Sequence, residues 1–198
     1  MLRPPTLRAT AITGFVLGLV LASAWPARGQ SDADDAARLV RALGVESGSV
    51  VGEVGAGRGA LTIAMARTVG PGGHVYSNEL DARRRDDITR AITAAGVHNV
   101  TVVEGQPAAT NMPAACCDAL FMRDVFHHVA DRPAMSRSLF ATLTPGGRLA
   151  VLDFPPRRSH GITADEVRAT LEGAGFADVR VEATGARWFL VVAARPAS

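Results

Sequence analysis

Three glycines alternate with other residues directly after an acidic residue, Glu53; they are Gly55, Gly57 and Gly59. An apolar run precedes this loop at 50–54, and a helix-like stretch follows it at 60–69. Glycine lets the backbone come close to a ligand, and the N-terminus of a helix favours negative charge. A strand, a glycine turn and a helix in this order are typical of a site for an adenosine-containing ligand.

A second group of residues has the chemistry to accept a proton. Asp124, His127 and His128 follow an apolar stretch at 118–122, which we expect to be a strand. Carboxylates and imidazoles are common general acids and bases. Neighbouring histidines point in different directions, so at most one is expected to face a ligand; the alternative is that both pack and hydrogen-bond within their loop. No metal site is predicted, because no cysteine or carboxylate lies at ligand spacing.

The elements that must position these residues alternate along the chain. Helices are expected at 32–43, 61–69, 81–95, 133–143 and 163–174, and strands at 50–54, 74–78, 100–103, 118–122, 149–153, 179–183 and 188–193. The alternation implies a parallel, doubly wound sheet with helices on both faces. The last two strands are joined by a short link, which allows only an antiparallel pair. The predicted fold class is α/β, with a single doubly wound seven-stranded sheet that is mostly parallel and has an antiparallel terminal strand.

The glycine pattern alone leaves the ligand open. Gly55-x-Gly57-x-x-Ala60, with Glu79 about twenty residues on, also fits the nicotinamide dinucleotide pattern. However, Glu53 would face a pyrophosphate badly and a cationic amine well. Other features outside that pattern are the third glycine of the loop, the Pro145-Gly146-Gly147 turn before the fifth strand and the antiparallel terminal pair.

Taken in order, four motifs resemble those of the class I S-adenosylmethionine-dependent methyltransferases. They lie at 53–59, 75–79, 118–129 and 143–149, and the resemblance covers about residues 33–195. The double histidine and the Gly175-Phe176 pair are most similar to the small-molecule branch, which includes the ubiquinone/menaquinone C-methyltransferases. The resemblance implies a Rossmann-like methyltransferase fold, S-adenosylmethionine as cofactor and a small-molecule acceptor.

The resemblance also implies which residues bind the cofactor. Glu79 is expected to accept hydrogen bonds from both ribose hydroxyls, and Glu53 is expected near the methionine amine. The implied cofactor-binding residues are Glu53, Gly55, Ala56, Gly57, Gly59, Glu79, Leu80, Gln106, Pro107 and Arg123. Gln106 departs from the family pattern, which often has an acid there to meet the adenine amine. Asp124, His127 and His128 are the catalytic candidates if the acceptor must lose a proton.

The N-terminal segment, residues 1–29, reads as a secretory signal peptide or an N-terminal membrane anchor. Arg3 and Arg8 precede an apolar run from Ala9 to Trp25, and small residues fit cleavage sites after Ala24 and Gly29. The predicted location is therefore exported (periplasmic or extracellular) or membrane-anchored, with membrane association through this segment. The alternative is a misplaced start codon before a cytoplasmic domain. Residues 30–198 form the predicted methyltransferase domain.

Composition excludes some chemistries and partners. All 21 basic residues are arginine, so there is no catalytic lysine and no Schiff base. The net charge of +2 includes three arginines of the leader (Arg3, Arg8 and Arg28), so the remainder carries −1. No nucleic-acid partner is predicted. The adjacent Cys116 and Cys117 are expected to be two reduced thiols, because a disulfide between neighbours closes a strained ring.

Three functions remain open at this stage. The first is methyl transfer from S-adenosylmethionine to an unidentified small molecule. The second is a catalytically degenerate module that binds S-adenosylmethionine or a nucleotide. Gln106, the short stretch at 153–161 where relatives carry a lid, and an exported location all favour this second function. The third is a nicotinamide-dependent reductase. The pattern indicates neither the acceptor nor the oligomeric state.

Overall fold

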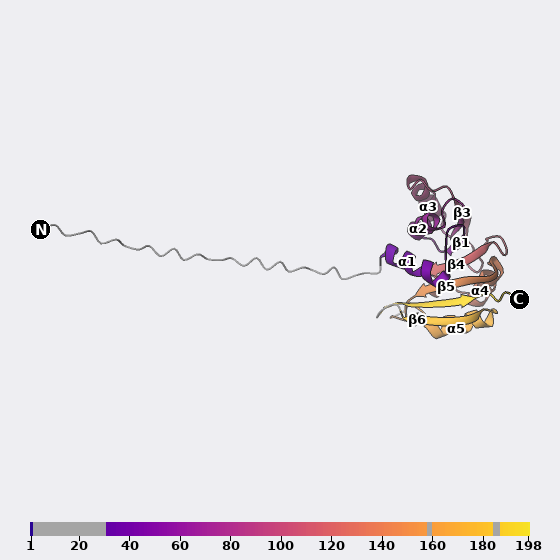
Figure 1. Ribbon diagram of the computed structural model, residues 1–198. Helices are drawn as coiled ribbons and strands as arrows, with labels where there is room; N and C mark the ends of the chain where they lie inside the picture. The colour runs from indigo at the N-terminus through magenta and orange to yellow at the C-terminus, as the bar shows by residue number, and fades with distance from the viewer. Residues whose placement is uncertain (2–30, 158–159, 184–186) are drawn as a thin grey trace.

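Seven strands form one sheet at the centre of the protein (Figure 1). The computed structural model describes residue 1 and residues 31–157, 160–183 and 187–198. The rest of the predicted leader and the link at 184–186 lie outside the described residues. The strands are β1 (Val50–Val54), β2 (His74–Glu79), β3 (Val100–Glu104), β4 (Cys117–Arg123), β5 (Leu143–Asp153), β6 (Ala177–Ala183) and β7 (Phe189–Ala194). Their order is β3-β2-β1-β4-β5-β7-β6.

The predicted fold class is confirmed. The pairs among β1 to β5 are parallel, whereas β7 is antiparallel to both of its neighbours, β5 and β6. The last strand of the chain is therefore the antiparallel one, and it lies between two others rather than at the edge of the sheet.

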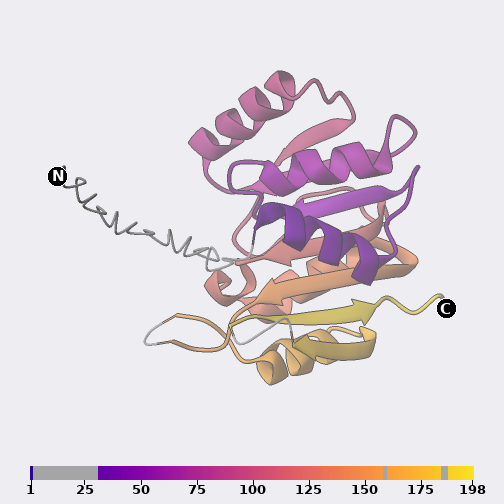
Figure 2. The same cartoon turned by 60° about the vertical axis from the view of Figure 1, so that its left-hand side comes forward.

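Helices cover both faces of the sheet. They are α1 (Asp32–Leu43), α2 (Ala60–Val69), α3 (Ala82–Ala94), α4 (Arg132–Thr142) and α5 (Ala164–Gly173), with a short 3₁₀ helix, η1 (Phe126–His128). Figure 2 shows α1 and α2 in front of the sheet, while α4 and α5 pack on the opposite face. Strand β4 serves both layers: Phe121 packs with the α1/α2 side, and Leu120 and Met122 pack with the α4/α5 side. Strands buried on both faces read as continuous apolar runs, which is why the sequence revealed them.

The strand order changes direction between β1 and β4, which are neighbours in the sheet although two strands separate them in the chain. In open α/β sheets, ligands bind at the carboxyl ends of the strands at such a point. Here the loops after β1 and β4 begin with Gly55 and Asp124, while Glu79 and Asp153 end β2 and β5. The fold therefore gathers both predicted groups of chemistry-bearing residues at one edge.

Strand β5 departs from the prediction, because it begins at Leu143 and not at 149. The Pro145-Gly146-Gly147 segment was expected to be only a turn. In the structure Gly146 N–H donates to the Arg195 carbonyl at 3.0 Å, and Arg195 N–H donates to the Gly147 carbonyl at 2.9 Å. These bonds with the C-terminal segment draw the turn into the ladder.

The prediction for the cysteines is wrong, because the structure joins Cys116 and Cys117 in a disulfide. The pair lies at the amino end of β4, opposite the edge that gathers the predicted site residues. Among the helices of the described residues, none has the length and apolar character needed to cross a membrane.

Candidate functional site

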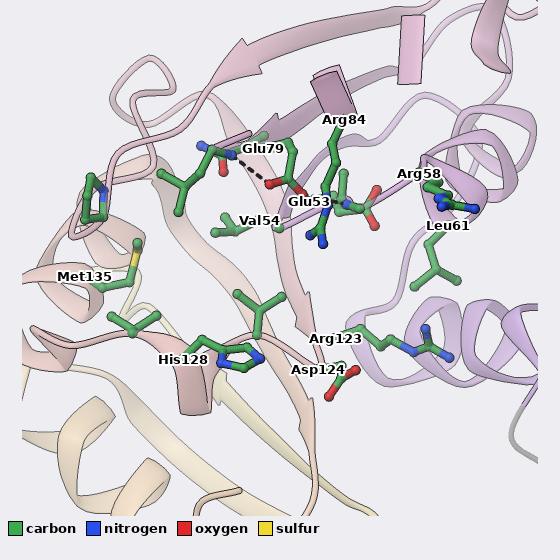
Figure 3. A pocket seen from close by; sticks show the side chains of 18 of the residues that line it. Glu53, Val54, Arg58, Leu61, Glu79, Arg84, Arg123, Asp124, His128 and Met135 are labelled. Carbon is green, nitrogen blue, oxygen red and sulfur yellow. Dashed lines mark hydrogen bonds between the residues drawn. The ribbon is translucent and has the colours of Figure 1, made fainter. Parts of the chain in front are cut away.

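A cavity of about 650 Å³ opens at the carboxyl ends of β1, β2 and β4 (Figure 3). Every predicted cofactor-binding residue except Gly59 lines it, and so do Asp124 and His128. Gly59 begins α2 as its N-cap, and His127 lies outside the lining. The structure therefore brings most of the glycine loop and two of the three candidate proton acceptors, Asp124 and His128, into one pocket.

The glycines of the loop serve different purposes. Gly55, Gly57 and Gly59 all have positive φ angles, which favour glycine. A Cβ at Gly55 would lie 2.4 Å from Cγ2 of Val125, whereas a Cβ at Gly57 would meet nothing within 4 Å. Gly55 is thus required by the packing of the protein itself. Gly57 leaves open space against the pocket, as a backbone that a ligand approaches should.

Glu79 is already well supplied with hydrogen bonds. Its Oε2 accepts from Gly57 N–H at 2.8 Å, and its Oε1 accepts from the N–H groups of Leu80 and Asp81 at 2.9 and 3.2 Å. A carboxylate offers about four acceptor sites. In this geometry Glu79 therefore has room for one further donor, and accepting from two hydroxyls requires the release of one backbone N–H.

Glu53 is a buried carboxyl, only 3% exposed. Thr62 donates a 2.5 Å hydrogen bond to its Oε2, and the Thr62 hydroxyl also contacts the Ser77 hydroxyl at 2.8 Å. Burial raises the pKa of Glu53 to about 8, although the Thr62 bond and the Arg123 charge act in the opposite direction. Glu53 is therefore largely protonated near neutral pH until a cation approaches it.

This raised pKa predicts a pH-dependent stability. The folded protein holds the Glu53 proton up to about pH 8, whereas an unfolded chain releases it near 4.5. The free energy of unfolding therefore falls as pH rises between these values, by up to ~1.4 kcal/mol per unit. We expect Glu53→Gln to remove this slope. From pH 4.5 to pH 7, the free energy of unfolding of the variant should therefore rise relative to that of the wild type by roughly 2–4 kcal/mol. Urea unfolding of both proteins across this range measures the difference.

The matched control is Glu172→Gln, a change at an exposed position on α5. Its stability curve should run parallel to that of the wild type. If the Glu53→Gln curve is also parallel, the assigned burial of the Glu53 charge is wrong.

Arg123, the last residue of β4, links the sheet to helix α1 at the pocket. Its Nε donates to Oδ2 of the fully buried Asp35 at 2.9 Å, and its Nη2 lies 3.3 Å from Oδ1 of Asp32. Its guanidinium also lies over the Trp188 ring, 5.9 Å from the centroid. Arg123 lines the pocket as predicted, but its charge is used to hold α1.

The two histidines have different surroundings. The His127 side chain is 4% exposed, and its Nδ1 lies 2.9 Å from Oδ1 of the fully buried Asp153. Asp153 also accepts from the backbone N–H groups of His127 and Phe154. His128 is exposed and lines the pocket. As expected, only one of the pair faces the cavity.

Asp124 is the exposed acid of this group. Desolvation raises its pKa, and the negative charge of Asp153 adds to this effect. The positive charges of His127, Arg123 and His128 act in the opposite direction. One potential ligand atom from each of Asp124, His127 and Asp153 lies within 4.8 Å of the others. The sequence spacing missed this group because Asp153 comes from another strand. With the His127 proton on Nδ1, Asp153 accepts hydrogen bonds from three N–H groups. We therefore assign the Asp153–His127 pair a structural role, which is to hold the turn after β4.

Several other lining residues were not predicted as site residues, and the charged ones among them are Asp32, Arg58 and Arg84. Asp153, which does not line the pocket, could have been found from the sequence because it lies at the end of a predicted strand, as Glu79 does. The signal for Arg84 was its place in the first turn of the helix after β2. The apolar part of the wall includes Leu80, Pro107, Val125, Val129 and Met135.

Comparison with known proteins adds independent findings. Residues 52–151 match the protein family described as "Methyltransferase domain". The ubiquinone/menaquinone biosynthesis C-methyltransferase UbiE of Pasteurella multocida (strain Pm70) is 32% identical over 112 residues, which are 56% of this chain and 42% of that relative. The match thus spans less than half of the relative's length.

Solved structures share the fold. A SAM-dependent methyltransferase from Aquifex aeolicus superposes with a TM-score of 0.74 at 25% identity, over 81% of this chain and 89% of that one. Phosphoethanolamine N-methyltransferase 2 of Haemonchus contortus, in complex with S-adenosyl-L-methionine, has a TM-score of 0.72 at 13% identity, over 82% and 52%. The second likeness concerns the fold alone.

Proposed function

This chain belongs to the methyltransferase domain family, and from that premise we propose that it transfers a methyl group to a small-molecule acceptor. Its fold and family are those of the class I S-adenosylmethionine-dependent methyltransferases, and its cofactor is S-adenosylmethionine. One observation carries the proposal. A single pocket is lined both by the glycine loop with Glu79 and by Asp124 and His128.

The residues present fit the cofactor. Gly57 leaves open space where a ligand comes close, Glu79 retains an acceptor site, and the apolar wall around Leu80 and Met135 suits a flat base. The buried Glu53 carboxyl suits an ammonium group, which favours its ionised form. When bound, S-adenosylmethionine supplies an activated methyl group together with its own leaving group.

The chain's own residues then have three tasks. The glycine loop and Glu79 position the ligand, and α1, held by Arg123, helps to cover the site. Asp124 and His128 are the proton acceptors that reach the pocket, and the raised pKa of Asp124 makes it a stronger base than an ordinary carboxylate. His127, held by Asp153, positions the turn that carries them.

The test combines binding and turnover with the full chain. Calorimetry with S-adenosylmethionine, its demethylated product and NAD should give binding to the first two alone. Demethylmenaquinol in detergent is the first acceptor to try, because the Pasteurella relative is a ubiquinone/menaquinone biosynthesis C-methyltransferase. We expect the demethylated form of the cofactor to appear at the same rate as the methylated acceptor. Cofactor binding without turnover on quinol and other small-molecule acceptors would favour a binding module instead.

Gln106 offers a test of cofactor affinity. It lines the pocket where the family often has an acid, and its amide oxygen can accept from the adenine amine only without charge. We expect Gln106→Asp to bind S-adenosylmethionine roughly fivefold more tightly, because charge-assisted hydrogen bonds are stronger than neutral ones. Gln106→Asn is the control, because an asparagine side chain has the same length as aspartate but carries no charge. Calorimetry that finds the Asp variant no tighter than the Asn variant would contradict the adenine assignment.

We also propose that the segment at 1–29 exports the chain or anchors it in a membrane. The proposal is supported by the arginines before the apolar run and by the cleavage patterns after Ala24 and Gly29. Mass spectrometry of the protein from its host membranes and secreted fraction locates the mature N-terminus. An intact N-terminus on protein from the cytoplasmic fraction would overturn this proposal.

A further inference from the structure

The disulfide between Cys116 and Cys117 is the strongest feature that the proposed function does not use. It joins the end of the loop at 105–116 to the first residue of β4. Cys117 is fully buried, whereas Cys116 is half-buried. The sequence contains no other cysteine, so a thiol reductant acts on this pair alone. The pair is therefore an element with two discrete chemical states, a disulfide and a dithiol.

The loop at 105–116 runs from the pocket to the disulfide. Gln106 and Pro107, near its start, line the cavity at the carboxyl edge of the sheet. Its last residue, Cys116, lies at the opposite edge, where its N–H donates to the Thr142 carbonyl at 3.0 Å. One loop thus spans the distance between the cofactor pocket and the redox pair.

A chain of buried hydrogen bonds follows the same route. The hydroxyls of Thr142 and Thr110 lie 2.7 Å apart, and Asn78 Nδ2 donates to the Thr110 carbonyl at 2.5 Å. The Asn78 carbonyl accepts from the N–H groups of Gly55 and Ala56 in the glycine loop, both at 2.9 Å. None of the three linking residues is more than 3% exposed. Because an unpaired buried polar group is costly, a displacement at one end of this chain disturbs the other end.

We propose that the redox state of the Cys116–Cys117 pair regulates the affinity of the pocket for S-adenosylmethionine, and that the disulfide is the tighter-binding state. The loop at 105–116 and the hydrogen-bond chain give the pair a continuous path to the glycine loop, and the disulfide supplies the two states. This regulation rests on the proposed function only through cofactor binding, and it needs no acceptor.

Opening the ring changes the end of the loop. Ala115, directly before the pair, has a φ of 48°, a left-handed conformation that costs an L-residue energy. Its N–H donates to the Ala141 carbonyl at 2.9 Å, beside the bond from Cys116 to Thr142. Without the ring, the backbone at 115–117 has more accessible conformations, so both bonds are held less firmly. The cofactor must then order the loop as it binds, and this ordering lowers the affinity.

The reduction needs a dithiol as co-reactant. A thiolate of the reductant attacks Sγ of the half-buried Cys116, which breaks the protein disulfide, forms a mixed disulfide and releases the Cys117 thiolate. The second thiol of the reductant then attacks the mixed disulfide and releases the Cys116 thiolate. The reductant ends as a disulfide, while the protein gains two electrons and two protons. Oxidising compartments, to which we propose that the leader sends the chain, favour the protein disulfide.

The test measures the affinity of the full chain for S-adenosylmethionine by calorimetry before and after treatment with dithiothreitol. Labelling of free thiols confirms the reduction. The oxidised wild type should bind about fivefold more tightly than the reduced one, near the lower end of usual coupling factors. Cys116→Ser cannot form the ring, so it should bind like the reduced wild type and should not respond to dithiothreitol.

Two threonine variants test the route. Thr142→Val removes the hydroxyl that contacts Thr110 while it keeps the disulfide, so it should bind with one affinity in both redox states. Thr144→Val is the matched control. Its hydroxyl donates to the Cys117 carbonyl at 3.3 Å, beside the disulfide but outside the chain, so the fivefold difference should remain. A full difference in Thr142→Val would exclude the hydrogen-bond chain as the route.

Linkage requires a reciprocal effect. Saturating S-adenosylmethionine should make the disulfide about fivefold harder to reduce, measured as the shift of the thiol–disulfide equilibrium constant in a dithiothreitol titration. Equal affinity of the two wild-type states, or tighter binding by the reduced state, overturns the proposal and leaves the proposed function intact. If neither state binds the cofactor, the proposed function fails as well.

Discussion

Gly57→Ala is expected to weaken S-adenosylmethionine binding by about 10- to 100-fold while lowering the free energy of unfolding by only ~1–2 kcal/mol. The backbone at Gly57 has a φ of +60°, which costs an L-residue some strain. The added Cβ meets no protein atom within 4 Å and so takes space on the ligand side. Calorimetry and urea unfolding measure the two effects separately.

Gly96→Ala is the control for strain. Gly96 has a φ of +65°, an added Cβ there also meets nothing within 4 Å, and the residue does not line the pocket. The two variants should lose similar stability, and only Gly57→Ala should lose affinity. Wild-type affinity in Gly57→Ala would remove this glycine from the binding surface.

Gly55→Ala separates the two uses of glycine in one loop. Its Cβ would lie 2.4 Å from Val125, so we expect a loss of stability of about 3 kcal/mol. The double variant Gly55→Ala with Val125→Ala should recover part of this loss. No recovery would mean that the backbone conformation, and not the contact with Val125, requires glycine.

Asp153→Ala is expected to cost about 3 kcal/mol of stability, because a buried carboxylate with several N–H donors is lost from the core. Asp153 is fully buried, accepts from the backbone N–H groups of His127 and Phe154, and lies 2.9 Å from His127 Nδ1. Asp124→Ala, only a few ångströms away, should cost less, about 1 kcal/mol, because its side chain is exposed and the loss comes only from its φ of 62°, which alanine adopts less readily than aspartate.

These neighbouring acids should therefore affect different properties. Asp124→Ala should fold normally and lose methyl transfer by about 100-fold or more if it is the base. Asp153→Ala should unfold at lower urea concentration. Equal stability of the two variants would show that the Asp153–His127 pair does not hold the turn after β4.

The sequence predicted the sheet well because each strand is an apolar run with a clear stop. Val50–Val54 and Asp32–Leu43 were placed at the observed bounds. The start of β5 could not be predicted, since Leu143 pairs with Cys117 and the Pro145-Gly146-Gly147 segment bonds with Arg195, both far along the chain. Local pattern carries no information about such a partner.

The same limit applies to the site. Glu53 and Glu79 were found because each lies at or near the end of a strand in a recognisable motif. Asp153 also ends a strand, but its contact with His127 joins two segments that only the folded sheet brings together. The sequence spacing likewise predicts one role, access for a ligand, for both Gly55 and Gly57. Only the atoms around each glycine show that Gly55 is needed for internal packing and that Gly57 leaves space for a ligand.

The hydrogen bond between Gly57 N–H and Glu79 makes recognition of a ribose an exchange rather than an addition. A nucleoside that offers two hydroxyls displaces one internal donor, which must then find water or the ligand itself. The net gain per hydroxyl is therefore smaller than a carboxylate with free acceptor sites would give. In return, the loop between β1 and α2 keeps its shape before the ligand arrives, so less conformational entropy is lost on binding.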